Sequence, residues 1–171
     1  MAVFAALLVV AVPGSAEASY VYRDAVLATP GLVDYWRLGE AGGTTLFSST
    51  NDDHATATDG VTFEAPGPIS GDAANRGVRL DGLLDHLDAD PGYLGAAERV
   101  SVEAWVKVSD LKKVHTVVTN AASEYEDGWT LAVWSNNKVR WSLATDSSTA
   151  VGVYSPFELV TERWYHLVGT Y

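Results

Sequence analysis

The sequence predicts an all-β fold, an antiparallel two-sheet sandwich of the jelly-roll type. The first observation is the stretch over residues 100–108, V-S-V-E-A-W-V-K-V, in which small apolar residues alternate with residues of mixed character. Because strand side chains point alternately to two faces, this stretch predicts one buried and one partly exposed face. The second is a succession of about nine or ten short strand-like segments separated by Gly, Pro, Asn and Asp turns, which is typical of sandwiches and jelly rolls.

The N-terminal residues have the features of a secretory signal peptide. A continuous apolar run covers residues 3–12, Pro13-Gly14 interrupts it, and residues 16–18 form an A-x-A cleavage site. A basic residue before the run, the third feature of such signals, is absent. The run is too short to span a bilayer as a helix. We expect a signal peptide over residues 1–18 and the domain over residues 19–171; the alternative is a buried first strand or helix.

The remaining expected elements are short. One helix is expected over residues 20–29, where Pro30-Gly31 would end it. The strand at residues 100–108 is too apolar for a bare edge and is expected at the centre of a sheet. Further strands are expected at residues 34–40, 61–64, 77–80, 83–89, 115–121, 151–154 and 164–171, and a hairpin at residues 129–143.

The hairpin carries the most specific turn prediction. Asn136 and Asn137 can both adopt positive φ, which suits a two-residue type I′ turn. That register pairs Trp134 with Val139, and Ala132 with Trp141. These side chains would then lie on one face as a cross-strand cluster.

The composition excludes several function classes. The chain has 22 acidic and 11 basic residues, a formal net charge of −11, which disfavours nucleic acid or an anionic membrane as a partner. It has no cysteine, which excludes disulfides and thiolate metal sites. Motifs for nucleotide binding, zinc hydrolysis or a serine nucleophile are absent from the sequence. The acidic cluster at residues 124–127 is expected to be a solvated loop.

Five stretches resemble, in the same order, the motifs of laminin G-like domains with the concanavalin A-like jelly-roll fold. They are Y-W-R-L-G-E at residues 35–40, G-V-R-L-D-G at 77–82, S-V-E-A-W-V-K at 101–107, the hairpin at 127–143 and W-Y-H-L-V-G-T-Y at 164–171. Leu80 stands where phenylalanine is usual. The resemblance implies further strands after Tyr171, so we expect a domain whose C-terminal strands are missing from this chain.

The resemblance also implies calcium as a cofactor, because many such domains bind calcium through loops. Asn51, Asp52 and Asp53 are the first candidates, since calcium takes oxygen ligands from loops. A second acidic group lies over residues 81–88. The alternative is a turn rich in Asx residues that needs no metal.

Carbohydrate is the second expected ligand, and tryptophan is the residue type that would stack on it. The candidates by type are Trp105, Trp129, Trp134 and Trp141, each with the alternative of core or cross-strand packing. Related glucan-cleaving enzymes carry paired carboxylates in E-x-D-x-x-E, which this sequence lacks, so we expect no enzyme.

The first functional hypothesis is therefore a non-catalytic binding or adhesion module, secreted or at the cell surface. Its partners would be carbohydrate or extracellular protein, without nucleic acid and without membrane insertion after signal cleavage. The alternatives are an accessory domain of a larger exported glycoside hydrolase, or a purely structural interaction domain.

Overall fold

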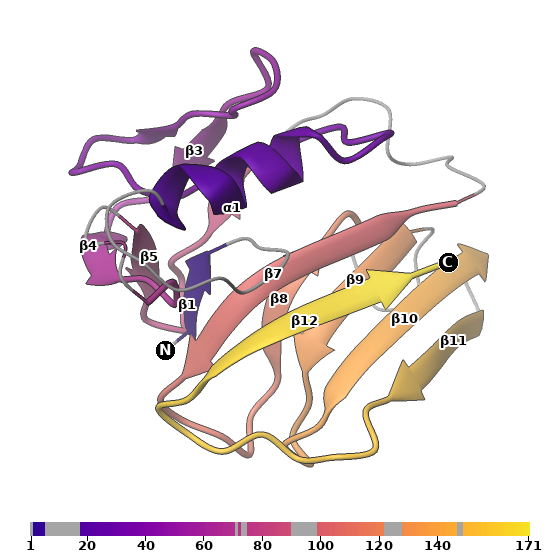
Figure 1. The fold of residues 1–171 in the computed structure, drawn as a ribbon. Coiled ribbons are helices and arrows are strands. Elements are labelled where there is room, and N and C mark those ends of the chain that lie inside the picture. The colour runs from indigo at the N-terminus through magenta and orange to yellow at the C-terminus, as the bar shows by residue number, and fades with distance from the viewer. Residues whose placement is uncertain are drawn as a thin grey trace. The chain divides into compact units, whose positions relative to one another are not determined.

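A computed structural model describes residues 2–5, 18–70, 72, 75–89, 99–121, 128–146 and 149–171, and strands are the predominant regular element of these ranges (Figure 1). All the strand pairs with a described register are antiparallel, which confirms the predicted all-β class. The elements in chain order are β1 (Ala2–Ala5), α1 (Ala18–Leu27), β2 (Thr45–Leu46), β3 (Ala55–Ala57), β4 (Thr62–Pro66), β5 (Arg76–Leu80), β6 (Leu87–Asp88), β7 (Ser101–Val108), β8 (His115–Thr119), β9 (Gly128–Val133), β10 (Val139–Asp146), β11 (Thr149–Tyr154) and β12 (Trp164–Thr170).

The chain divides into two compact units, Val3–Pro91 and Gly92–Tyr171. In the first unit, β2, β3 and β6 form a three-stranded sheet, and β4 pairs with β5. The helix α1 confirms the predicted short helix and ends before Pro30-Gly31, where Gly31 has a φ of 77°. The core of this unit includes Val26, Tyr35, Leu38, Leu46, Ala55, Ala57 and Val78.

Two strand predictions in the first unit are wrong. Residues 34–40 are not a regular strand and form only an isolated bridge, between Trp36 and Ser48. The backbone leaves the extended region at Leu38, whose φ is 58° and whose side chain is buried. Residues 83–89 contain only the two-residue strand β6, because the segment before it is a tight turn closed by Asp81.

The second unit is a two-layer sandwich. One layer contains the antiparallel pair β7–β12, and the other is a sheet in the order β11-β10-β9-β8 (Figure 1). The alternation predicted for β7 is confirmed: Ala104, Val106 and Val108 are buried, and the residues between them are at least partly exposed. Between the layers, Trp141 on β10 packs so closely on Gly169 that a Cβ there would lie 2.3 Å from its ring.

The hairpin prediction is correct in place but wrong in register. Asn137 adopts a φ of 64°, whereas Asn136 does not take positive φ. Trp134 N–H donates to the carbonyl of Lys138 at 2.8 Å, so three residues form the loop instead of two. Trp141 therefore pairs with Leu131 rather than Ala132, and every side chain of the strand changes its cross-strand neighbour.

Some predictions fall partly or wholly outside the described residues. Strand β1 lies within the predicted signal peptide, residues 6–17 are outside the described ranges, and the signal peptide stays a prediction. The acidic cluster at residues 124–127 is also outside them. Within the described ranges, no helix combines the length and apolar character required to cross a bilayer.

Candidate functional site

The outward face of the β7–β12 pair collects aromatic and charged side chains. The alternation of β7 places Glu103, Trp105 and Lys107 on the face opposite the buried residues. The register of β12 sets Val168, His166 and Trp164 directly opposite these three. Cross-strand partners share a face, so the two strands build one continuous surface, here called the β7–β12 face.

His166 is the centre of this face. Its Nε2 lies 3.2 Å from Oε2 of Glu103, a contact that becomes an ion pair when the imidazole is protonated. Its ring lies 5.3 Å from the Trp105 ring at 33°. Beside them, Nζ of Lys107 lies 5.5 Å from the centre of the Trp164 ring. Glu103 is the most accessible of the charged members, with 38% of its side chain exposed, against 21% for His166.

Two nitrogens on the β7–β12 face have no hydrogen-bond partner among the described residues. They are Nε1 of Trp105 and Nε2 of His166, and both are shielded from solvent. The 3.2 Å contact of His166 Nε2 with Glu103 is close enough for an ion pair but lacks the geometry of a hydrogen bond. A shielded polar group without a partner costs about 1–3 kcal/mol, so such groups are uncommon and call for an explanation.

The other three predicted ligand-binding tryptophans have different surroundings. Trp129 and Trp141 are buried, with ring centres 5.7 Å apart, and Nε1 of Trp141 donates to the carbonyl of Thr170 at 3.1 Å. These two have the core role that the sequence left open as an alternative. Trp134 is partly exposed, and the Arg140 guanidinium lies 4.7 Å from the centre of its ring. Of the four, Trp105 alone contacts the Glu103–His166 pair.

The predicted calcium loop is held by its own turn contacts. Oδ1 of Asn51 accepts the N–H of Asp53 at 2.9 Å, and the Asp53 carbonyl accepts Nε1–H of Trp36 at 2.9 Å. Asx-turn chemistry therefore explains this loop without a metal. The described residues contain no group of three or more His, Asp or Glu side chains that could hold a metal ion. Calcium binding at Asn51, Asp52 and Asp53 stays a prediction.

The second acidic group is also tied to backbone. Oδ1 of Asp81 accepts the N–H groups of Leu83 and Leu84 at 2.7 and 3.2 Å. The N–H of Leu83 is the main cause that lowers the pKa of Asp81. Oδ2 of Asp85 accepts the N–H of Asp81 at 2.9 Å. These carboxylates close the turn that precedes β6.

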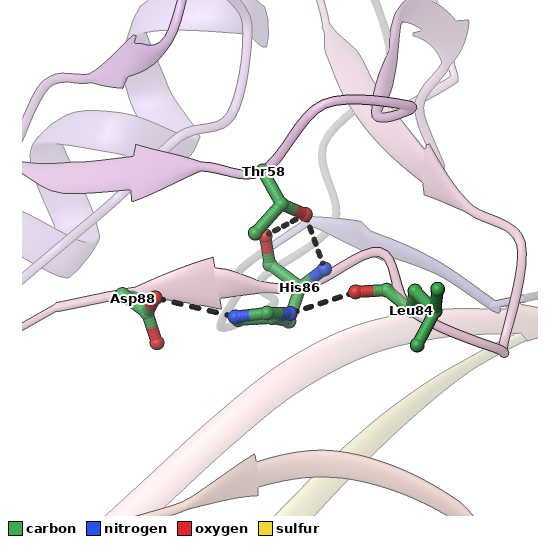
Figure 2. A network of polar contacts seen from close by, with 4 residues as sticks. All are labelled: Thr58, Leu84, His86 and Asp88. Carbon is green, nitrogen blue, oxygen red and sulfur yellow. Dashed lines mark hydrogen bonds and ion pairs between the residues drawn. The ribbon is translucent and has the colours of Figure 1, made fainter.

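Figure 2 shows the network that fixes the end of this turn. The ring of His86 lies between the Leu84 carbonyl, 2.8 Å from Nδ1, and the Asp88 carboxylate, 3.3 Å from Nε2. The backbone N–H of His86 donates to Oγ1 of Thr58 at 2.9 Å, which joins the turn to the end of β3. Asp88, the third acidic residue of the second group, therefore contacts His86.

The sequence did not single out Glu103 or His166 as site residues. The signal that could have joined them is the pairing of β7 with β12, because the two strands carry similar alternation and pair in register along their length. The paired residues are about sixty positions apart in the sequence, and the periodicity of one segment does not predict which distant strand it pairs with.

Comparison with known proteins agrees with this fold. A family model described as the concanavalin A-like lectin/glucanases superfamily, of the laminin G type, matches residues 80–171, which is more than half of the chain. Searches of curated proteins and of solved structures gave no match. The chain therefore belongs to the laminin G-like domains of the concanavalin A-like lectin/glucanases superfamily.

Proposed function

We propose that this chain is a non-catalytic carbohydrate-binding module that recognises its ligand on the β7–β12 face. Membership of a superfamily of lectins and glucanases supports a role in binding carbohydrate or protein. The observation that carries the proposal is the contact of Trp105 with the Glu103–His166 pair, all three on one sheet face. These residues lie within the part of the chain that matches the family.

The chemistry of this face suits a sugar. A sugar hydroxyl both donates and accepts hydrogen bonds, and the C–H face of the ring packs on an indole. Glu103 offers acceptors, and Nε1 of Trp105 is a donor without a hydrogen-bond partner among the described residues, beside the imidazole that contacts Glu103. Lys107, whose Nζ lies 3.9 Å from Oε2 of Glu162, borders the face beside Trp164.

The same geometry favours binding over hydrolysis. Glycoside hydrolases place two carboxylates about 5–9.5 Å apart across the bond that they cleave. On the β7–β12 face, which lies wholly within the described residues, Glu103 is the one carboxylate contributed by these two strands. Its neighbour is an imidazole, which matches neither role of a carboxylate pair.

Two further parts of the proposal depend on sequence features alone. The predicted signal peptide favours a secreted or cell-surface location, where carbohydrate or extracellular protein would be the partner in adhesion. Calcium at Asn51, Asp52 and Asp53 would assist by ordering a loop of the first unit.

A glycan array with the purified chain tests the function, followed by calorimetry with the best ligand. Glu103→Gln keeps the shape of the side chain but removes its charge, and we expect about tenfold weaker binding because hydrogen bonds to charged groups contribute about 1.5–3 kcal/mol. Glu158→Gln, an equivalent change at an exposed position in the same unit, is the control and should bind like the wild type. Equal affinity of the two variants, or cleavage of the ligand during the titration, would contradict the proposal.

A further inference from the structure

We propose a second binding site, in the first unit, for a sugar acid, meaning a sugar ring that carries a carboxylate. The site is a hollow with a volume of about 260 Å³. It lies outside the family-matched residues and is independent of the β7–β12 face. Its lining consists of Arg37, Gly39, Glu40, Phe47, Ser49, Asn75 and Arg76.

The backbone around the hollow is fixed by contacts between distant segments. Trp36 and Ser48 form a β-bridge, and Ser49 N–H donates to the Tyr35 carbonyl at 2.8 Å. Between them, Leu38 holds a φ of 58° with its side chain in the core. Positive φ in a branched residue is strained, and such strain concentrates at ligand sites. Leu38 is buried in the core, whereas Arg37 and Gly39 on either side of it line the hollow.

Glu40 contributes an acceptor that the described protein residues leave unpaired. Its Oε1 accepts the N–H of Phe47 at 2.9 Å, which anchors the carboxylate. Its Oε2 is shielded from solvent and has no hydrogen-bond partner among the described residues. A shielded carboxylate oxygen needs a donor, and a ligand hydroxyl can supply one.

Two arginines contribute the donors. Arg37 and Arg76 line the same hollow, and among the described residues Arg76 donates one long bond, of 3.4 Å, to the Glu64 carbonyl. With one carboxylate and two guanidiniums, the lining has a net charge of +1, in a chain whose net charge is −11. A local positive hollow on an acidic protein favours an anionic ligand, and the guanidinium fork matches a carboxylate.

These groups together select the chemical class. A simple carboxylate would satisfy the arginines but leave Oε2 of Glu40 without a donor. A neutral sugar would satisfy Glu40 but would not use the positive charge. A sugar acid does both, and Phe47, a residue that is 56% exposed, offers a ring for its C–H surface. The volume suits one sugar residue better than a long oligomer, because sites for drug-sized ligands begin at about 300 Å³.

The test is a titration of the full chain, labelled with ¹⁵N, with sodium glucuronate, glucose and acetate. We expect glucuronate to bind at least fivefold more tightly than glucose or acetate and to shift the amide signals of residues 37–49 and 75–76. Arg37→Gln should reduce glucuronate affinity about tenfold and remove the preference over glucose. Arg79→Gln, on the same strand as Arg76 and outside the hollow, should change neither.

Each outcome decides the inference. If Arg37→Gln fails to fold, Arg76→Gln gives the same comparison. Equal affinities for glucuronate and acetate, or for glucuronate and glucose, would overturn the proposal, as would shifts confined to residues 101–107 and 164–170. Loss of glucuronate binding in Glu103→Gln but not in Arg37→Gln would refute this site and leave the function proposed for the β7–β12 face intact.

Discussion

The contact between Trp141 and Gly169 makes the packing between the two layers of the second unit directly testable. A Cβ added at residue 169 would lie 2.3 and 2.4 Å from two carbons of the Trp141 ring. Separations below 3.0 Å are not tolerated, and the buried ring also donates a hydrogen bond to Thr170, so it cannot move without losing that bond. Gly169→Ala should therefore force the two layers apart.

The magnitude follows from these two contributions. Overpacking a core costs about 1–3 kcal/mol, and loss of a hydrogen bond costs about 1 kcal/mol. A total of about 3 kcal/mol corresponds to a Tm lowered by about 6–12 °C for a chain of this size. Thermal melts followed by circular dichroism, and urea melts followed by tryptophan fluorescence, measure it. Gly39→Ala is the control, because a Cβ there meets nothing within 4 Å. An unchanged Tm for Gly169→Ala would refute the packing described here.

Three further predictions concern pH, the hairpin turn and calcium. Burial lowers the pKa of His115 below 6.5, so the unfolded state binds the proton more tightly than the folded state. The contribution of the neutral imidazole to stability should be fully present above pH 6.5 and should be lost as the pH falls below it. In urea melts at several pH values, His115→Asn should reduce this loss of stability at low pH. Asn137→Ala should lower the free energy of unfolding by about 1–2 kcal/mol, because φ at this residue is 64° and its Oδ1 accepts the N–H of Lys112 at 3.0 Å; an unchanged stability would contradict the turn assignment. If Asn51, Asp52 and Asp53 bind calcium, millimolar calcium should raise the Tm and chelator reverse it, whereas an indifferent Tm removes the calcium proposal.

The sequence predicted the parts of the fold that depend on local alternation. Strand β7 follows its pattern residue by residue, because burial of one face requires an apolar side chain at every second position. The strand expected at residues 34–40 failed because alternation there is interrupted by the left-handed Leu38, a conformation that sequence seldom signals for leucine.

The candidate site depends on contacts that the sequence does not report. Trp105 was predicted as a ligand-binding residue by its type, but its neighbours were set by the register of β12. Likewise, Trp141 has the core role that was left open as an alternative, and a shift of one residue in the hairpin gives it Leu131 rather than Ala132 as its cross-strand neighbour. Register is fixed by turn geometry and by the burial of whole faces, which act over many residues.

A sugar bound on the β7–β12 face should contact Trp105. The chain has six tryptophans, so a ¹⁵N-labelled sample gives a small set of indole N–H signals, and Trp105→Phe assigns the signal of interest. On titration with the best ligand from the glycan array, we expect the Trp105 indole signal to move in proportion to binding while that of the buried Trp129 stays in place. Saturable binding that leaves the Trp105 signal unmoved would contradict it.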